Sequence, residues 1–356
     1  MILHIIQPAI PRYRVPFFKT LADSFTLKLY ASKVDFLNVK SEEVGNCSWL
    51  GSFRVFLGIF WQDNLNLFSA YRKGDVVVIN GNPRILNYML LLVILKIRGI
   101  KTVWWGHGWT AGSFGIFASL RLKISKIADV RIFYHEREVE RAQIKGSFAL
   151  NNGLCPKNIS NAKNSIRYGT SVKRDPSLLT LIFIGRLTDK SGLFSLIEAM
   201  SLLSSPTELI VVGDGPILNS VRATAVELNV INQITFVGSL FEELEIAKYM
   251  DMADVFVYPG AVGLSIIHAF NYAKPAIIHS DMRFHMPEAH AFIENVNGVS
   301  FEMGSSVSLA LAIERFQKMS EYDLSVMALN SLLTVEKNYT VRDMVERFKE
   351  AINSVL

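Results

Sequence analysis

The chain has 356 residues, half of them hydrophobic and 19% charged, and its formal net charge is +5. This length predicts two domains of ordinary size, and the composition excludes an intrinsically disordered chain. The mild positive charge suits an anionic small molecule or an anionic membrane surface better than nucleic acid, because no long block of lysine and arginine occurs.

Signals of cellular location favour the cytoplasm. The first residues lack the basic and apolar regions of a signal peptide, and the two cysteines, Cys47 and Cys155, are far apart and lack zinc-site spacing. The most apolar run, residues 88–95, predicts a buried helix, since a bilayer span needs about 20 apolar residues. We expect a cytoplasmic protein, with peripheral contact to the inner face of the cell membrane as a further hypothesis.

Short apolar runs rich in β-branched and aromatic residues alternate with longer helical patterns along the whole chain. Continuous apolar strands separated by helices are typical of parallel sheets covered on both faces. Two such sets predict an α/β protein with two doubly wound, Rossmann-like domains facing each other across a cleft. The predicted strands are residues 2–6, 26–30, 76–80, 102–105, 130–134 and 148–151 in the first half, and 181–185, 209–213, 234–238, 255–258, 276–279 and 299–301 in the second.

A polar segment at residues 158–176, rich in Asn, Ser, Lys and Arg, predicts a linker between the two domains. The expected boundaries are 1–165 for the first domain and 176–340 for the second. Residues 341–356 have helical periodicity at Met344, Val345, Phe348 and Ile352, which predicts a C-terminal amphipathic helix packing back toward the first domain.

Open parallel sheets bind ligands at the carboxyl ends of their strands, so residues there are the candidates for function. In the first half, Arg12 and Arg14 follow the first strand. One interpretation is that they bind a phosphate of the donor or the acceptor, and the alternative is that they are ordinary solvated side chains. Asn82 and Trp109 are further acceptor-side candidates. His107 follows the strand 102–105 between two glycines, which make a poor core and favour an active-site histidine over a buried structural one.

A second feature of the first half is a run of cations. Between residues 121 and 126 cations alternate with Leu and Ile, and Arg137, Arg141 and Lys145 follow. Such a face is compatible with contact to anionic lipid, and an ordinary solvated helix surface is the alternative.

Phosphate-binding chemistry gathers in the second half. Arg186 and Lys190 follow the strand 181–185. The Arg186 guanidinium offers a fork of N–H donors to phosphate oxygens, and the Lys190 ammonium offers a point charge. The alternative is that both are ordinary solvated surface cations. A glycine-rich loop precedes a helix that begins near Leu264, and loop amides with the helix's positive end suit a diphosphate. The predicted donor-binding residues are Gly185, Gly213, Gly215, Val237, Gly260, Val262, Gly263, Leu264, Ser265 and His268.

In their order, these motifs resemble those of family-four glycosyltransferases, which have the GT-B fold. The resemblance covers the chain from about residue 179 to the C-terminus. It rests on Gly185-Arg186-Leu187 with a lysine, Gly213-Asp214-Gly215-Pro216, Phe236-Val237-Gly238, Ala253-Asp254-Val255, Tyr258-Pro259, Gly263-Leu264, Pro287-Glu288 and Asn297-Gly298.

The sequence departs from the family pattern at three positions. The family carries two glutamates around the glycine loop, the first contacting the transferred sugar and the second the nucleotide ribose. Gly260 and His268 occupy those positions here. The lysine also comes one place early, because Ser191 stands where the family's lysine falls.

The resemblance implies a retaining hexosyl- or deoxyhexosyltransferase that needs no metal or other cofactor. Its donor would be a UDP- or GDP-sugar, and its acceptor a glycan or lipid-linked glycan in bacterial surface polysaccharide assembly. His107 would lie near the donor sugar, where it contacts the sugar or helps to handle the acceptor proton. Arg186 and Lys190 would offset the charge of the leaving diphosphate. Two alternatives stay open: a catalytically silent GT-B subunit that binds nucleotide or scaffolds a partner, and an epimerase-like enzyme acting on nucleotide sugars.

Overall fold

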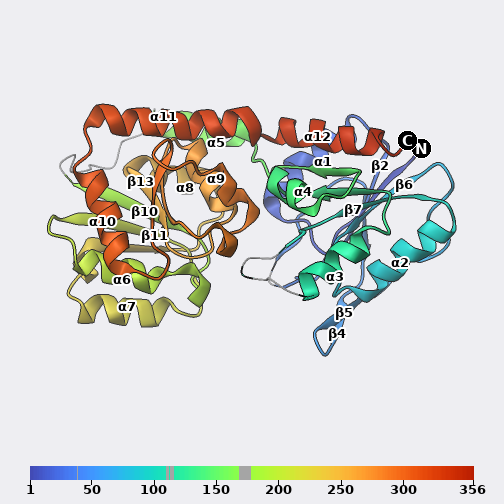
Figure 1. The fold of residues 1–356 in the computed structure, drawn as a ribbon, viewed down its shortest axis with the longest axis horizontal. Helices are drawn as coiled ribbons and strands as arrows, with labels where there is room; N and C mark the ends of the chain where they lie inside the picture. The colour runs from blue at the N-terminus through green and yellow to red at the C-terminus, as the bar shows by residue number, and fades with distance from the viewer. Residues whose placement is uncertain (38, 110–111, 113–115, 168–177) are drawn as a thin grey trace. The chain divides into compact units, whose positions relative to one another are not determined.

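The structure is a computed structural model that describes residues 1–37, 39–109, 112, 116–167 and 178–356. The chain divides into two compact units (Figure 1). The first comprises Met1–Asn152 together with Val341–Leu356, and the second comprises Gly153–Thr340.

The first unit is a parallel sheet of seven strands in the order β3-β2-β1-β6-β7-β8-β9. The chain adds β2 and β3 on one side of β1 and then returns to add β6 on the other side, so the strand order reverses between β1 and β6. The strands are β1 (Leu3–Ile6), β2 (Leu27–Ser32), β3 (Cys47–Leu50), β6 (Val76–Asn80), β7 (Lys101–Trp105), β8 (Val130–Phe133) and β9 (Ser147–Ala149).

Helices α1, α2 and α12 each bury an apolar face in this unit. The C-terminal helix α12 belongs to this unit, and its Phe348 ring lies 5.4 Å from that of Phe17 and 5.5 Å from that of Trp105. The remaining elements are η1 (Arg12–Arg14), α1 (Val15–Ala22), the antiparallel hairpin of β4 (Phe53–Phe56) and β5 (Ile59–Gln62), α2 (Leu86–Ile97), α3 (Ile116–Ser125), α4 (Glu136–Ala142) and α12 (Val341–Asn353).

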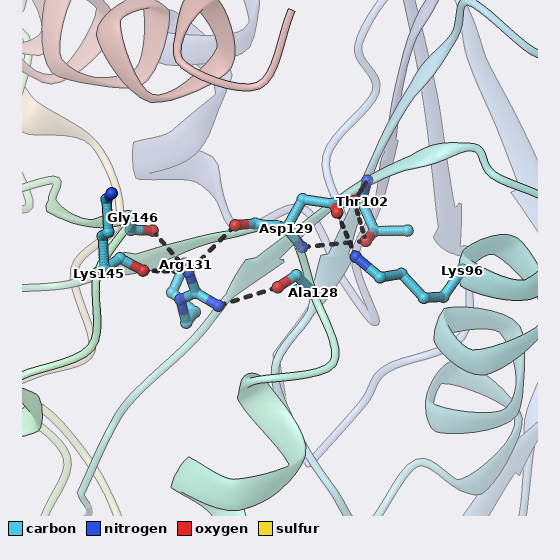
Figure 2. Close-up of polar contacts among 7 residues, drawn as sticks. All are labelled: Lys96, Thr102, Ala128, Asp129, Arg131, Lys145 and Gly146. Atoms are coloured by element: carbon cyan, nitrogen blue, oxygen red, sulfur yellow. Dashed lines mark hydrogen bonds and ion pairs between the residues drawn. The ribbon is translucent and has the colours of Figure 1, made fainter.

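A polar network ties together the beginnings of β7, β8 and β9 (Figure 2). The Asp129 carboxylate accepts from the Thr102 amide and hydroxyl, each at 2.9 Å, and from Lys96. The buried Arg131 guanidinium donates to four backbone carbonyls. These contacts lie at the amino ends of the strands, so the network supports the fold and leaves the opposite edge to ligands.

The second unit is a parallel sheet of six strands in the order β12-β11-β10-β13-β14-β15, whose order reverses between β10 and β13. Its strands are β10 (Leu179–Ile184), β11 (Thr207–Val212), β12 (Ile234–Gly238), β13 (Val255–Tyr258), β14 (Ala276–His279) and β15 (Gly298–Phe301). Its helices are α5 (Pro156–Arg167), η2 (Asp189–Ser191), α6 (Leu193–Ser201), α7 (Leu218–Glu227), η3 (Ile231–Gln233), α8 (Glu243–Met252), α9 (Leu264–Asn271), η4 (Met282–Phe284), η5 (Pro287–Ala291), α10 (Ser306–Gln317) and α11 (Glu321–Asn338).

The twelve predicted strands are present, each within a few residues of its expected bounds. The linker prediction needs a correction. Residues 156–167 form helix α5, whose Ile159 and Ala162 are buried in one apolar cluster with Ala247 of α8, and residues 153–165 group with the second unit. The rest of the expected linker, residues 168–176, lies outside the described residues.

Helix α2 is only half buried, which corrects the prediction for residues 88–95. One face packs into the core through Tyr88, Leu91, Leu92 and Leu95, but Leu86, Leu90, Val93 and Ile97 are exposed on the other. None of the helices in the described ranges combines the length and apolarity needed to cross a bilayer.

Candidate active site

Two loops of the second unit meet where its strand order reverses. Because β10 and β13 pair in parallel, their carboxyl ends lie side by side, and Arg186 follows one strand while the loop 259–263 follows the other. The two loops are hydrogen-bonded directly: the Gly260 amide donates to the Ser191 carbonyl at 3.0 Å, and the Ala261 amide to the Lys190 carbonyl at 3.1 Å. The sequence-predicted residues on both loops are therefore brought together at the edge where such sheets bind ligands.

Gly260 has no room for a side chain. A Cβ atom there would stand 2.0 Å from the Lys190 carbonyl oxygen and 2.6 Å from the Ser191 carbonyl carbon. Both of these atoms belong to backbone, which a substitution cannot push aside by changing a rotamer. The turn η2 thus occupies the space that a side chain at position 260 would need.

The loops after β10, β11 and β12 are joined in the same way. Gly213 has a φ of +145°, and a Cβ atom there would stand 1.9 Å from the Gly185 carbonyl oxygen. The Gly213 amide donates to the Gly238 carbonyl at 2.8 Å, and the Leu187 amide to the Asp214 carbonyl at 3.0 Å. The predicted glycines thus serve close backbone approach, which fixes the path of the chain around Arg186.

The cations of this edge stay available to a ligand. Arg186 and Lys190 are both exposed, and neither forms an ion pair in the described part of the chain. Together they place positive charge next to the loop that leads into α9. An anion at this position would meet guanidinium and ammonium donors as well as the positive end of a helix.

The amides of the glycine-rich loop are less available than predicted. Those of Gly260, Ala261 and Val262 all donate within the protein. Val262 is fully buried, and its carbonyl accepts from the Met286 amide at 2.9 Å. The prediction that Val262 contacts the donor is therefore corrected, because it supports the loop. Gly263, Leu264 and Ser265 supply the first amides of α9, which have no acceptor within the helix.

His285, which the sequence reasoning missed, holds this loop in place. Its Nδ1 accepts from the Val262 amide at 3.2 Å, and its Nε2 donates to the His279 carbonyl at 2.9 Å. The two imidazoles are stacked with centroids 3.7 Å apart. Burial lowers the pKa of His285 to about 4, so the ring is neutral and this tautomer is fixed by its two partners. No local pattern marks His285, since it acts on a loop 23 residues away.

His268 points to a carboxylate on the neighbouring helix. Its Nε2 lies 2.8 Å from Oε1 of Glu243, and the Tyr272 hydroxyl donates to the same oxygen at 2.6 Å. The sequence analysis expected His268 to bind the donor. The structure instead makes it one of two groups that hold Glu243 in the first turn of α8.

His107 lies at the end of β7 in the first unit, in a loop fixed by two backbone contacts. The Gly106 amide donates to the Ile132 carbonyl at 3.1 Å, and the Gly108 amide to the buried Glu138 carboxylate at 2.9 Å. Burial, followed by the charges of Arg121 and Arg14, lowers the pKa of His107 to about 3. The imidazole is therefore neutral at physiological pH. Glu138, another residue that sequence reasoning missed, positions the loop.

The predicted acceptor-side residues separate from one another. Arg14 is buried and lines a cavity of about 160 Å³, whereas Arg12, Asn82 and Trp109 are absent from its lining. The Asn82 side chain accepts from the Arg84 amide at 3.1 Å, and the Arg141 guanidinium lies 4.3 Å from the Trp109 ring centroid. Of these four residues, Arg14 is the one that lines this cavity.

Part of the sequence matches a known protein family. Residues 171–326 match the family described as Glycosyl transferases group 1. The chain is a glycosyltransferase. The comparison with curated proteins found no match.

Solved structures confirm the predicted fold of this glycosyltransferase, which is GT-B with two Rossmann-like domains. HepE from Anabaena in complex with UDP is 14% identical with a TM-score of 0.69, over 99% of both chains. The lipopolysaccharide outer core galactosyltransferase WaaB is 14% identical with a TM-score of 0.70, over all of both chains. Sucrose-phosphate synthase from Thermosynechococcus elongatus is 16% identical with a TM-score of 0.66, over 99% of this chain and 98% of that one.

Proposed function

We propose that the chain moves a hexosyl or deoxyhexosyl group, with retention, from a UDP- or GDP-sugar to a glycan or lipid-linked glycan during bacterial surface polysaccharide biosynthesis. One observation carries the proposal: two exposed cations, Arg186 and Lys190, follow β10 where the strand order reverses, next to the loop that leads into α9. The likeness to HepE, solved with UDP-glucose, supports a nucleotide-sugar donor. The likeness to WaaB supports a bacterial glycan as acceptor.

In this proposal the leaving diphosphate is stabilised by protein groups. Negative charge grows on the diphosphate as the glycosidic bond to the donor breaks, and Arg186 and Lys190 interact more strongly with that charge than with the intact donor. The first amides of α9 add dipolar donors on the same side. Since these groups meet the charge, we expect turnover without an added metal ion.

His107 then contacts a hydroxyl of the donor sugar and does not remove a proton from the acceptor. Its pKa of about 3 makes the neutral ring a weak base near pH 7. A neutral imidazole still donates from one nitrogen and accepts at the other.

Glu243 is our candidate for the carboxylate that the family carries at position 268. His268 and Tyr272 both contact its Oε1. The carboxylate therefore lies beside α9, although Glu243 itself belongs to α8. We propose that its other oxygen accepts from a ribose hydroxyl. We propose no replacement for the family's other glutamate, at position 260, because backbone atoms fill the space that a side chain would need there.

The test is a panel of nucleotide diphosphates and nucleotide sugars, read by thermal stabilisation and by slow hydrolysis of the donor. We expect UDP or GDP to stabilise the protein, and R186M to weaken that effect at least tenfold in concentration. R315M is the matched control, because Arg315 is an exposed cation of the same unit on α10. Equal nucleotide affinity in both variants would contradict the proposal.

A catalytically silent subunit is the second candidate, favoured by the missing side chain at Gly260. Turnover separates the two functions. A purified chain that binds nucleotide but forms no glycosidic bond with any acceptor, and hydrolyses no donor, would be a binding subunit. An altered nucleotide sugar without a new glycosidic bond would instead indicate an epimerase.

We also propose peripheral contact with an anionic membrane, through a surface that the sequence analysis did not select. Leu57 and Phe56 at the tip of the β4–β5 hairpin are 87% and 75% exposed, and Ile97 at the end of α2 is 81% exposed. The hairpin and α2 are neighbours, since the Arg84 side chain before α2 donates to the Gly58 carbonyl at 2.7 Å. Residues 51–101 contain seven lysines and arginines but only two acidic residues. Exposed apolar groups within a basic segment suit anionic lipid headgroups.

Flotation with vesicles of phosphatidylglycerol and phosphatidylcholine tests this surface. We expect L57S/I97S to float less than the wild type, and L311S, which changes a leucine of α10 that is 62% exposed, to float normally. K123Q on α3 tests the cationic face that the sequence analysis favoured. Loss of flotation only in K123Q would indicate that the cationic face of α3 binds the membrane instead. If the wild type does not float, the proposal of membrane contact is wrong.

A further inference from the structure

Two buried arginines of the first unit have very different surroundings. Arg131 is 5% exposed, and its two terminal nitrogens donate to the carbonyls of Ala128, Asp129, Lys145 and Gly146, as Figure 2 shows. Arg14 is 6% exposed, yet a single oxygen accepts from its guanidinium, Oδ1 of Asn152 at 2.6 Å. Its other hydrogen-bond partner is the Met344 sulfur at 3.4 Å, a weak acceptor.

The positive charge of Arg14 also has no ionic partner. None of the described carboxylates forms an ion pair with it. The faces of Trp105 and Tyr134 lie 5.0 Å and 5.6 Å from its Cζ and supply part of the missing stabilisation. A guanidinium has five N–H donors, so most of this group's hydrogen-bonding capacity is unused in a place that water reaches poorly.

Arg14 lines the cavity of about 160 Å³ together with Gln7, Asn80, Trp105 and Tyr134. Gln7 directly follows β1 and Asn80 ends β6, so the cavity stands where the strand order of the first sheet reverses. This is the position at which open parallel sheets bind their ligands. A water molecule takes up about 30 Å³ of liquid, so the cavity holds a group several times that size.

The polar groups around the cavity are mainly unused donors. The Asn80 side-chain amide donates to Oε1 of Gln7 at 2.9 Å, which occupies the Gln7 acceptor and leaves its Nε2. That Nε2 and the Trp105 Nε1 are both buried, and neither has an acceptor within the described structure. Buried donors without acceptors are costly, and a ligand rich in acceptors would satisfy them.

We propose that this cavity binds an anionic group, a carboxylate or a phosphate ester, of the sugar that receives the transferred residue. A buried cation with spare donors recognises an acceptor-rich anion, and a neutral hydroxyl would leave the charge uncompensated. The assignment of the anion to the acceptor substrate rests on the proposed glycosyl transfer, whereas anion binding by the cavity does not.

Calorimetric titration of the full chain, without donor, tests the anion specificity. The probes are glucose, glucuronate, glucose 6-phosphate and inorganic phosphate. We expect at least one charged sugar to bind about 10- to 100-fold more tightly than glucose, which corresponds to one charge-assisted hydrogen bond. Glucuronate binding most tightly would identify a carboxylate, and glucose 6-phosphate a phosphate ester. R14M should abolish the preference.

Arg14 also links Asn152 and α12, so a second variant guards against loss of folding. Q7E keeps Arg14 and its partners but puts a carboxylate at the cavity, which should remove the preference by repulsion. N152L is the matched control, since it removes a partner of Arg14 without removing the charge, and the preference should persist. Equal affinity of the wild type for glucose and for every anion, or a preference retained in both R14M and Q7E, would overturn the assignment.

The outcome stays separate from that of the proposed function. Donor hydrolysis by water needs no acceptor and is measured on the wild type in parallel. Hydrolysis without anion preference would reject the cavity assignment and keep the glycosyltransferase proposal. Anion preference without any donor turnover would keep the cavity as an anion site and reject its link to an acceptor.

Discussion

Replacing Gly260 with alanine tests whether the two loops at the carboxyl ends of β10 and β13 form one unit. The added Cβ atom would stand 2.0 Å from the Lys190 carbonyl oxygen, and an ordinary contact begins at 3.4 Å, so the loops must separate by about 1.4 Å. That movement breaks the hydrogen bonds from the amides of Gly260 and Ala261. Two lost bonds, at about 1 kcal/mol each, and about 1–3 kcal/mol of overpacking give a destabilisation of about 3–5 kcal/mol.

Thermal unfolding followed by circular dichroism measures this change. For a unit of this size we expect the melting temperature of the second unit to fall by roughly 6–20 °C. The control is G45A, because nothing stands within 4 Å of a Cβ atom at Gly45. Nucleotide binding should weaken with G260A, since Lys190 moves with its carbonyl. A G260A protein as stable as G45A, with unchanged nucleotide affinity, would refute the reasoning.

Three further predictions follow from the same geometry. R186M should lower kcat by about 100- to 1,000-fold, measured by donor turnover, because it removes stabilisation of the leaving diphosphate; a loss below threefold would speak against that role. Folding depresses the pKa of His107 to about 3 and of His285 to about 4. The unfolded chain therefore takes up protons before the folded chain as pH falls below about 6.5, and each histidine should lower the free energy of unfolding by about 2 kcal/mol at pH 5. Urea unfolding at several pH values measures this change. A free energy of unfolding that stays constant between pH 7 and pH 5 would contradict the prediction. E138Q should keep one acceptor for the Gly108 amide and reduce kcat less than E138A does, and equal losses would exclude positioning of His107 by Glu138.

Much of the fold was predictable because the buried strands of a parallel α/β sheet have a recognisable local sequence pattern. β1 and β6 are buried on both faces, so they appear as continuous apolar runs such as Val76–Asn80. Their ends coincide with polar or glycine residues, which marks the ligand-binding edge. Leu264 was the predicted start of α9 and is its first residue, since a glycine directly precedes it.

Elements at the margins of the sheet were harder to predict. The edge strand β3 is mainly half-buried and the β4–β5 hairpin is largely exposed, so neither is buried on both faces. Helix α5 resembles a linker in composition, because it buries only a narrow apolar face through Ile159 and Ala162. In these elements tertiary contacts decide the structure and local pattern does not.

The supporting residues of the site could not be found from sequence because their partners are distant. His285 acts on Val262, Glu243 on His268, and Glu138 on Gly108, with each pair separated by more than 20 residues. The burial of Arg14 depends on α12, more than 300 residues away. The sequence predicted that these charged groups follow the carboxyl ends of the strands, but only the folded chain shows which of them remain exposed.

The central claim concerns where the second unit holds a diphosphate. A crystal structure of the chain with whichever of UDP or GDP stabilises it more would test that claim most directly. We predict phosphate oxygens within hydrogen-bonding distance of Arg186 and of the first amides of α9. A nucleotide bound at another edge of the sheet, with Arg186 still directed into solvent, would contradict it.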